Sequence, residues 1–257
     1  GTNGSGADAA YLRNTPIEIT EIETPIEITR YGLMRDTGGA GRWRGGLATA
    51  LDFRVFAPDS RVSARNRDRS RFRPWGTLGG KAAGLSDMII NPGTGQEKRL
   101  GNIDYTVLQP GDVLHIHSAG GGGRGSPLER EPWRVAEDVA RGYVSVHAAA
   151  RDYGVVMMEG VVDEGATTTQ RAGLADHQPV GHFHFGPERD EFEKVWTTEA
   201  YAQMTQLLAE LPVHWRFFVK TELFARFGNA AGTLQEAFEQ VRVRFPQVPD
   251  VVSKAEH

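Results

Sequence analysis

Hydrophobic and polar residues alternate with a period of two over much of the first half of the chain. Ile17 and Ile19 alternate with polar neighbours, as do Ile26 and Ile28 beyond a break at Pro25. This alternation is typical of half-buried strands, so we predict one strand on each side of the break. Proline and glycine turns separate five further expected strands, at about 47–56, 61–67, 84–91, 97–108 and 112–118.

The pattern becomes helical after Pro132. Short helices are predicted over 133–141 and 145–152, and the polar, aperiodic stretch 161–185 is predicted to be a loop or linker. Three more helices are predicted at about 198–211, 213–227 and 233–244, the last opened by a capping box of Thr233 and Glu236. Strands first and helices last indicate an α+β fold, a β-rich body with short helices followed by a C-terminal helical tail. The expected divisions are a β-rich domain over 1–160, a linker over 161–190 and the tail over 191–257.

Composition narrows the functional classes. The chain has 257 residues, 31 glycines and no cysteine, and its formal net charge is -4. Without cysteine it forms neither disulfides nor a thiolate metal site, which agrees with the cytoplasmic location we expect. The small negative charge gives no general attraction to nucleic acid or membranes, and no apolar run reaches the roughly 18–20 residues of a membrane span. Neither partner is therefore expected.

The glycine run after the last expected strand is the most unusual feature of the sequence. Ordering consecutive glycines costs backbone entropy, so such a run is kept where the backbone passes close to a ligand or another chain. The run fits G-x-G-x-x-G formally, but Pro127 interrupts the helix start that a dinucleotide site needs. No Walker sequence is present either, so this chain is not expected to bind ATP. We predict a loop at a subunit or active-site boundary, with the candidate contacts Gly121, Gly122, Gly123 and Arg124.

Arginine recurs at every second position from residue 65 to residue 73. On an extended chain these side chains would project from one face, where carboxylates, anions or solvent must balance them: Arg65, Arg67, Arg69, Arg71 and Arg73. A solvated or salt-bridged face is the ordinary explanation. The functional alternative is an anchor for an anionic group or an acidic partner, with Arg65, Arg69 and Arg71 as candidates. Nucleic acid is disfavoured because stacking aromatic residues are not interleaved.

Two further groups of residues are candidates for contacts with a substrate or at an interface. His115 and His117 would point to the same face of a strand, a spacing seen in metal sites. Because no third ligand follows by spacing, a structural or substrate-contacting role is favoured and no metal ligand is assigned. Trp75 lies in a glycine-rich turn, and so does Trp43, which stands between Arg42 and Arg44. Turn packing and the rim of an active site both remain open for these aromatic residues.

Five ordered blocks over about residues 11–156 carry a family resemblance. They are N-T-P-I-E at 14–18, G-G-A-G-R-W-R-G-G at 38–46, R-F-R-P-W-G at 71–76 with Gly79-Gly80, the glycine run at 120–125, and the segment from Leu128 to Val155. Together they resemble the C-terminal half of the hydantoinase B/oxoprolinase family. Members usually carry an N-terminal half of similar size, and this chain begins at Gly1, so we expect it to be the second part of a longer subunit.

The resemblance implies a subunit of an ATP-dependent hydrolase of hydantoins, lactams or 5-oxoproline, or of a related acetone or acetophenone carboxylase. A hydantoinase A-like partner would bind ATP and Mg²⁺ and phosphorylate the substrate. A divalent metal, Zn or Mn, would lie in the N-terminal half, so this chain alone is expected to bind no cofactor. The alternative of another class is a non-catalytic scaffold domain of the oligomer.

Overall fold

A computed structural model describes residue 3 and residues 15–64, 69–100, 103–175, 181–229 and 231–250. The chain forms two compact units, residues 1–188 and residues 189–257. The strands that the structure describes lie in the first unit, and helices make up the described elements of the second, so the fold is α+β as predicted.

A five-stranded antiparallel sheet forms the centre of the first unit. Its order is β1-β2-β8-β5-β6, from strands β1 (Ile26–Leu33), β2 (Thr49–Val55), β8 (Val113–His117), β5 (Asp87–Ile90) and β6 (Lys98–Arg99). A second antiparallel pair joins β3 (Ser60–Ala64) to β7 (Ile103–Leu108). The strand predictions at 47–56, 84–91 and 112–118 are confirmed. The single strand predicted over 97–108 is two strands, β6 and β7, in two different sheets.

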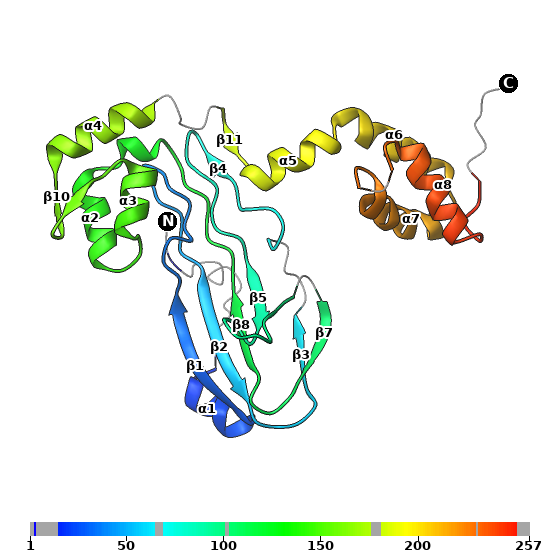
Figure 1. The fold of residues 1–257 in the computed structure, drawn as a ribbon, viewed down its shortest axis with the longest axis horizontal. Coiled ribbons are helices and arrows are strands. Elements are labelled where there is room, and N and C mark those ends of the chain that lie inside the picture. The colour runs from blue at the N-terminus through cyan, green and yellow to red at the C-terminus, as the bar shows by residue number, and fades with distance from the viewer. Residues whose placement is uncertain are drawn as a thin grey trace. The chain divides into compact units, whose positions relative to one another are not determined.

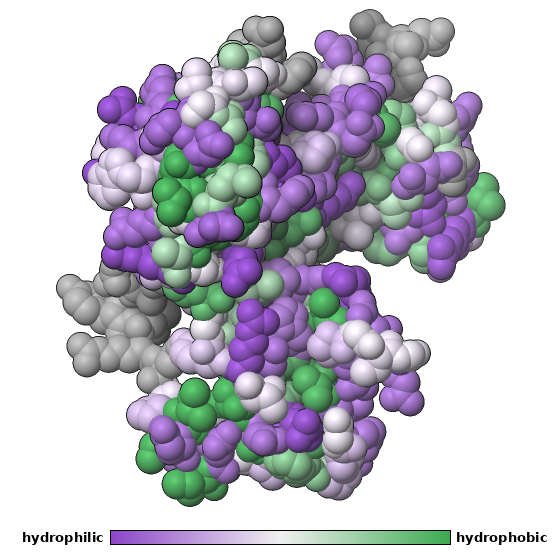
Figure 2. Space-filling model, turned by 60° about the vertical axis from the view of Figure 1, so that its left-hand side comes forward, coloured by the Kyte–Doolittle hydropathy of each residue, from purple (hydrophilic) through white to green (hydrophobic). Residues whose placement is uncertain are grey.

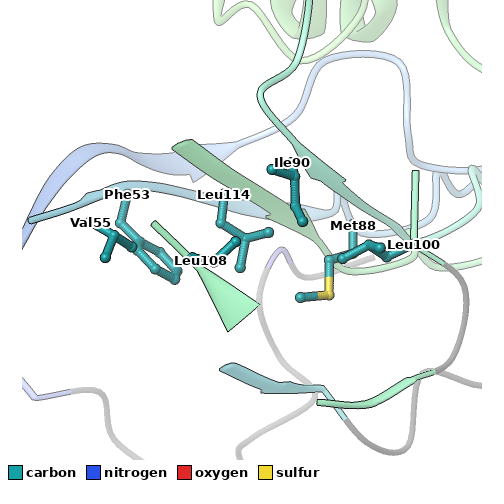
Figure 3. Packing of buried hydrophobic residues seen from close by; sticks show 7 residues of the cluster. All are labelled: Phe53, Val55, Met88, Ile90, Leu100, Leu108 and Leu114. Carbon is teal, nitrogen blue, oxygen red and sulfur yellow. The ribbon is translucent and has the colours of Figure 1, made fainter. Parts of the chain in front are cut away.

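One face of the five-stranded sheet carries the main core of this unit. Seven buried residues gather there, as Figure 3 shows: Phe53, Val55, Met88, Ile90, Leu100, Leu108 and Leu114. Because side chains alternate along a strand, the residues between these positions face the other side of the sheet. That side carries Asp52 and His115, which stand opposite each other on β2 and β8.

The expected strand over residues 17–20 is wrong, because residues Ile17–Glu23 form the helix α1. No residue of α1 is buried, and Ile22 is 80% exposed, so no core selects the strand conformation. Glu18 lies in the first turn, where its charge suits the helix dipole. The Glu21 carboxylate also accepts a hydrogen bond from the Ile28 N–H at 2.7 Å, which holds the helix against β1.

A group of helices lies at the far end of the long strands from α1 (Figure 1). The short 3-10 helix η2 (Pro127–Glu129) leads into α2 (Pro132–Ala140) and α3 (Val146–Tyr153), so both predicted short helices are confirmed. Ser145 caps α3 through the Ala148 N–H, and Gly154 ends it with a φ of 62°. Seven residues make the second core of this unit: Ala40, Val135, Val144, Ala148, Ala149, Tyr153 and Val155.

The loop predicted over 161–185 is also wrong. It contains strand β10 (Val161–Val162), paired with β9 (Met157–Met158), then helix α4 (Glu164–Leu174), and strand β11 (Phe183–His184), paired with β4 (Gly76–Thr77). Threonines conceal the helix in the sequence, because β-branched residues have low helix propensity. In the structure Thr167 is buried, and the Thr168 hydroxyl donates to the Glu164 carbonyl at 2.8 Å.

The second unit is a small helical bundle. Its helices α6 (Thr198–Glu210), α7 (Val213–Arg226) and α8 (Leu234–Arg244) confirm the three predicted helices, and α5 (Pro187–Val195) leads into them. The predicted capping box at Thr233 and Glu236 is present. Trp196 is buried against Phe224, with ring centroids 4.2 Å apart. In the space-filling view of the whole protein in Figure 2, hydrophobic residues on the visible face lie among hydrophilic ones.

Candidate functional site

Three glycine-rich segments pack backbone against backbone between the sheet and the helices α2–α4. We call residues 38–46, 76–84 and 120–125 the glycine layer; they run side by side in Figure 1. The Gly39 N–H donates to the Gly121 carbonyl at 2.9 Å, the Gly121 N–H to the Gly46 carbonyl at 2.8 Å, and the Gly123 N–H to the Lys81 carbonyl at 3.0 Å. Main-chain hydrogen bonds therefore connect the three segments.

At several positions the spacing within the glycine layer leaves no room for a Cβ atom. A Cβ on Gly45 would lie 1.7 Å from the Gly121 carbonyl oxygen, and a Cβ on Gly122 would lie 1.7 Å from the Trp75 carbonyl oxygen. Such distances are far inside van der Waals contact. The close approach that the sequence attributes to a ligand or another chain is made here by the chain's own backbone.

The two candidate arginines beside Trp43 have different surroundings. Arg44 is buried, and its Nε donates to the Asp138 carboxylate at 3.2 Å, while Arg130 donates to the same carboxylate oxygen at 2.8 Å. Arg44 is thus part of a buried ion triad that ties the glycine layer to α2. Arg42 is half exposed, with its guanidinium 3.8 Å from the Glu129 carboxylate.

Arg124 and Trp43 lie at the open end of the glycine layer. Their backbones exchange two hydrogen bonds of 3.0 Å, and both residues are exposed. Gly121 is exposed as well, whereas Gly123 is buried. The glycine layer therefore reaches the surface at this end.

The predicted alignment of the arginines at positions 65–73 on one face of an extended chain is wrong for the part that the structure describes. Residues 69–72 form a turn, and Arg65 and Arg67 lie outside the described residues. The Arg69 guanidinium lies 4.9 Å from the centre of the Trp75 ring, whereas Arg71 lies over Phe72. The extended conformation that would align these side chains is absent, because the chain turns ahead of Pro74.

Trp75 belongs to an exposed aromatic group. It contacts Phe183 and Phe185 on or beside β11, at centroid distances of 6.4 and 6.1 Å, and is 43% exposed. Packing within the turn thus buries part of the Trp75 side chain. The exposed part is available for the rim of an active site or for an interface.

Beside the glycine layer lies a charged pocket of about 430 Å³. Its charged and titratable lining residues come from distant parts of the chain: Asp36, Arg73, Lys81, Arg151, Asp152 and His184. Asp152 is central, because it accepts from Lys81 Nζ at 3.2 Å and from Arg151 through both oxygens at 3.1 and 2.6 Å. Burial acts to raise the pKa of Asp152, but the Arg151 hydrogen bonds and the charge of Lys81 outweigh it and hold this pKa below its usual range.

Hydrogen bonds connect the charged pocket to the segment around β11. Arg73 donates from Nε to both oxygens of Glu188 at 2.8 Å, and this hydrogen bonding lowers the pKa of Glu188. His184 accepts through Nδ1 from the Ala82 N–H at 2.9 Å. The pocket therefore presents cationic and anionic groups together, a lining suited to a small polar molecule that carries charge.

The candidates His115 and His117 lie on β8, which ends three positions before Gly120 of the glycine layer. His115 Nε2 and His117 Nδ1 are 3.0 Å apart, and the outer nitrogens face Asp52 and the Leu85 carbonyl. Among the described residues, no group of three or more His, Asp or Glu side chains could hold a metal ion. The Zn or Mn site implied by the resemblance therefore has no ligand set in the described part of this chain.

Sequence reasoning missed the charged pocket because its members are dispersed. Positions 36, 81, 152 and 184 share no motif, and only tertiary contacts join them. Lys81 follows Gly80 in a glycine-rich segment, but this pair lacks the rest of a nucleotide-binding motif. Within the described residues, none of the helices has both the length and the apolar character required for a bilayer crossing.

A family model described as hydantoinase B/oxoprolinase matches residues 1–127, which include the entire glycine layer. Through this segment the chain belongs to the hydantoinase B/oxoprolinase family. The caprolactamase subunit beta of Pseudomonas jessenii is 34% identical over 171 residues, 63% of this chain and 28% of that protein.

An acetone carboxylase sequence and an acetone carboxylase structure extend the comparison of this hydantoinase B-family chain. The alpha subunit from Xanthobacter autotrophicus is 27% identical over 248 residues, 75% of this chain and 30% of that protein. A nucleotide-free acetone carboxylase structure is similar in fold, with a TM-score of 0.54 and 22% identity over 92% of this chain and 33% of that one. The chain thus spans about a quarter to a third of the length of these relatives.

Proposed function

We propose that this chain works within a hydantoinase B-like subunit of an ATP-dependent hydrolase that opens a cyclic amide, such as a hydantoin, a lactam or 5-oxoproline. The observation that carries the proposal is the hydantoinase B/oxoprolinase segment over residues 1–127. The 34% identity to a caprolactamase subunit beta supports a lactam or a related ring as the substrate class.

The proposed reaction divides its tasks between two subunits. A hydantoinase A-like partner would bind ATP and Mg²⁺ and phosphorylate the carbonyl oxygen, because an amide carbon is a poor electrophile until its oxygen is esterified. Water would then add to the activated carbon, the ring C–N bond would break with a proton passing to the nitrogen, and hydrolysis would release phosphate. A divalent metal, Zn or Mn, would lie in the N-terminal half of the same subunit. This chain contributes the charged pocket, where Lys81 and Arg151 would attract an anionic intermediate near the rigid glycine layer.

A second candidate is an ATP-dependent ketone carboxylase. The relative that favours it is the acetone carboxylase alpha subunit, whose alignment extends over 75% of this chain. A third reading, from another class, is a scaffold domain that only completes the oligomer. As a scaffold, the domain would use the rigid glycine layer for structure alone, and the charged pocket would have no role in turnover.

The complete assembly that contains this chain tests these candidates. ATP consumption should depend on a lactam, hydantoin or 5-oxoproline under the hydrolase proposal, and on a ketone with bicarbonate under the carboxylase alternative. Lys81→Met should lower substrate-dependent turnover by about tenfold or more, because one cation of the charged pocket is lost. The control Lys98→Met, on the exposed strand β6, should leave turnover unchanged. Equal turnover in both variants would support the scaffold.

A further inference from the structure

The helical second unit carries an apolar groove between α6 and α7, which we call the α6–α7 groove. Its volume is about 420 Å³. Its lining is mainly apolar and includes two cations: Met204, Leu208, Ala209, Arg216, Phe217 and Lys220. The Phe217 side chain is 82% exposed, so a large aromatic ring at this groove faces solvent.

The α6–α7 groove is distinct from the core of the helical unit. Val219 and Leu223 of α7 are fully buried, and α8 packs against both α6 and α7, as Figure 1 shows. Arg216, Phe217 and Lys220 lie on a neighbouring face of α7, because residues three and four positions apart share one side of a helix. Helix α7 therefore has a second contact surface besides the one that it buries within its own unit.

Both charged side chains at the α6–α7 groove are cations, although the chain has a formal net charge of -4. The Lys220 ammonium lies 5.9 Å from the centre of the Phe224 ring, and it has no carboxylate partner among the described residues. Arg216 donates to the Leu211 and Ala209 carbonyls, at 2.9 Å each, and neither contact neutralises its charge. An apolar occupant would take both cations out of water, which is costly unless it brings carboxylates.

The walls of the α6–α7 groove favour a helical occupant. The backbone groups within α6 and α7 are paired inside each helix, and Arg216 takes the Ala209 and Leu211 carbonyls at the end of α6. An extended peptide would therefore place unpaired N–H and C=O groups on an apolar surface. A helix pairs its own backbone groups, and its ridge of side chains packs into the groove between two other helices.

We propose that the α6–α7 groove binds an amphipathic helix of a partner polypeptide, with apolar side chains on one face and aspartate or glutamate along the edges of that face. The apolar side chains would contact Met204, Leu208 and Phe217, and the carboxylates would pair with Arg216 and Lys220. Binding of this helix does not depend on the reaction that the assembly catalyses.

Two synthetic peptides of about 18 residues test this binding to the full chain. Both carry leucines along one helical face; the acidic peptide has glutamate along the edges of that face, and the basic peptide has lysine at the same positions. Fluorescence anisotropy at low salt should show at least about tenfold higher affinity for the acidic peptide, because it alone neutralises Arg216 and Lys220. Equal affinities, or no binding of the acidic peptide, would overturn the proposal.

Variants of the full chain locate the bound peptide. Phe217→Ser removes the exposed ring and should weaken binding of the acidic peptide by about tenfold. The matched control is Val243→Ser on α8, where the side chain is also 82% exposed, and it should leave binding unchanged. Lys220→Glu should abolish the preference for the acidic peptide, whereas Lys194→Glu on the exposed side of α5 should retain it. Circular dichroism checks that each variant keeps its helices.

A second copy of the chain is the competing occupant of the α6–α7 groove. Sedimentation equilibrium distinguishes it from a partner helix, since a monomeric wild-type chain that binds the acidic peptide supports the proposal. A wild-type dimer that Phe217→Ser dissociates would place a second copy in the groove and overturn the proposal. Equal loss of peptide binding in Phe217→Ser and Val243→Ser would also overturn it, because the peptide would then bind elsewhere.

Discussion

At the scale of single residues, the glycine layer restricts most strongly which side chains can be accommodated. A Cβ on Gly45 would meet backbone, not a flexible side chain, because the nearest atom is the Gly121 carbonyl oxygen at 1.7 Å. We expect Gly45→Ala to lower the free energy of unfolding by about 1–3 kcal/mol or more, as overpacking does. Urea denaturation followed by circular dichroism measures this loss.

Gly95→Ala is the matched control for that substitution. Gly95 lies in an exposed turn with no atom within 4 Å of its added Cβ, and its φ is not positive. The stability of this variant should stay within about 0.5 kcal/mol of the wild type. Similar losses in both variants would mean that the glycine layer is not closely packed.

Asp152 in the charged pocket links stability to acid pH. Its pKa is held below the usual range, so the folded state favours the charged carboxylate more than the unfolded state does. The resulting stabilisation is complete above about pH 4 and is lost as the pH falls through the lower folded-state pKa. Asp152→Asn should therefore flatten the acid side of a profile of Tm against pH. Glu159→Gln, in an exposed turn, should leave that profile as it is.

At the scale of elements, the sequence predicted those whose local pattern agrees with their tertiary environment. Hydrophobic and polar residues alternate along β2 and β8 because one face of these strands is buried. The capping box of α8 is visible in the sequence itself. The prediction failed for α1, whose alternating isoleucines meet no core, and for α4, whose threonines hide the helical period. Local pattern is informative only where packing uses the same periodicity.

Helix α4 can be tested through its N-cap. The Asp163 side chain accepts a hydrogen bond from the Ala166 N–H at 2.9 Å. Asp163→Ala should destabilise the helix by about 0.5–2 kcal/mol and speed amide hydrogen exchange in its first turns. Gly173→Ala, with open space around its Cβ, should act in the opposite direction by about 0.5–1 kcal/mol. Unchanged exchange in Asp163→Ala would contradict the capping role.

At the scale of the whole molecule, the sequence predicted the class of fold but not the partners of its candidate residues. It singled out Arg44 and His115, yet their carboxylate partners, Asp138 and Asp52, lie 94 and 63 positions away. The charged pocket joins still more distant segments. Long-range contacts of this kind leave no trace in composition or periodicity, so a single sequence does not predict them.

The glycine layer also bears on how an alignment of relatives should be interpreted. An invariant glycine beside a reactive centre is commonly taken as a sign of chemistry, yet Gly45 and Gly122 are fixed here by contact between main chains. Because the obstructing atom belongs to another backbone segment, no single replacement elsewhere can make room for a Cβ. Selection at these positions would then be strict even in a relative that had lost its activity. Invariance in the glycine layer would record descent and foldability, and evidence for catalysis must come from the residues around it.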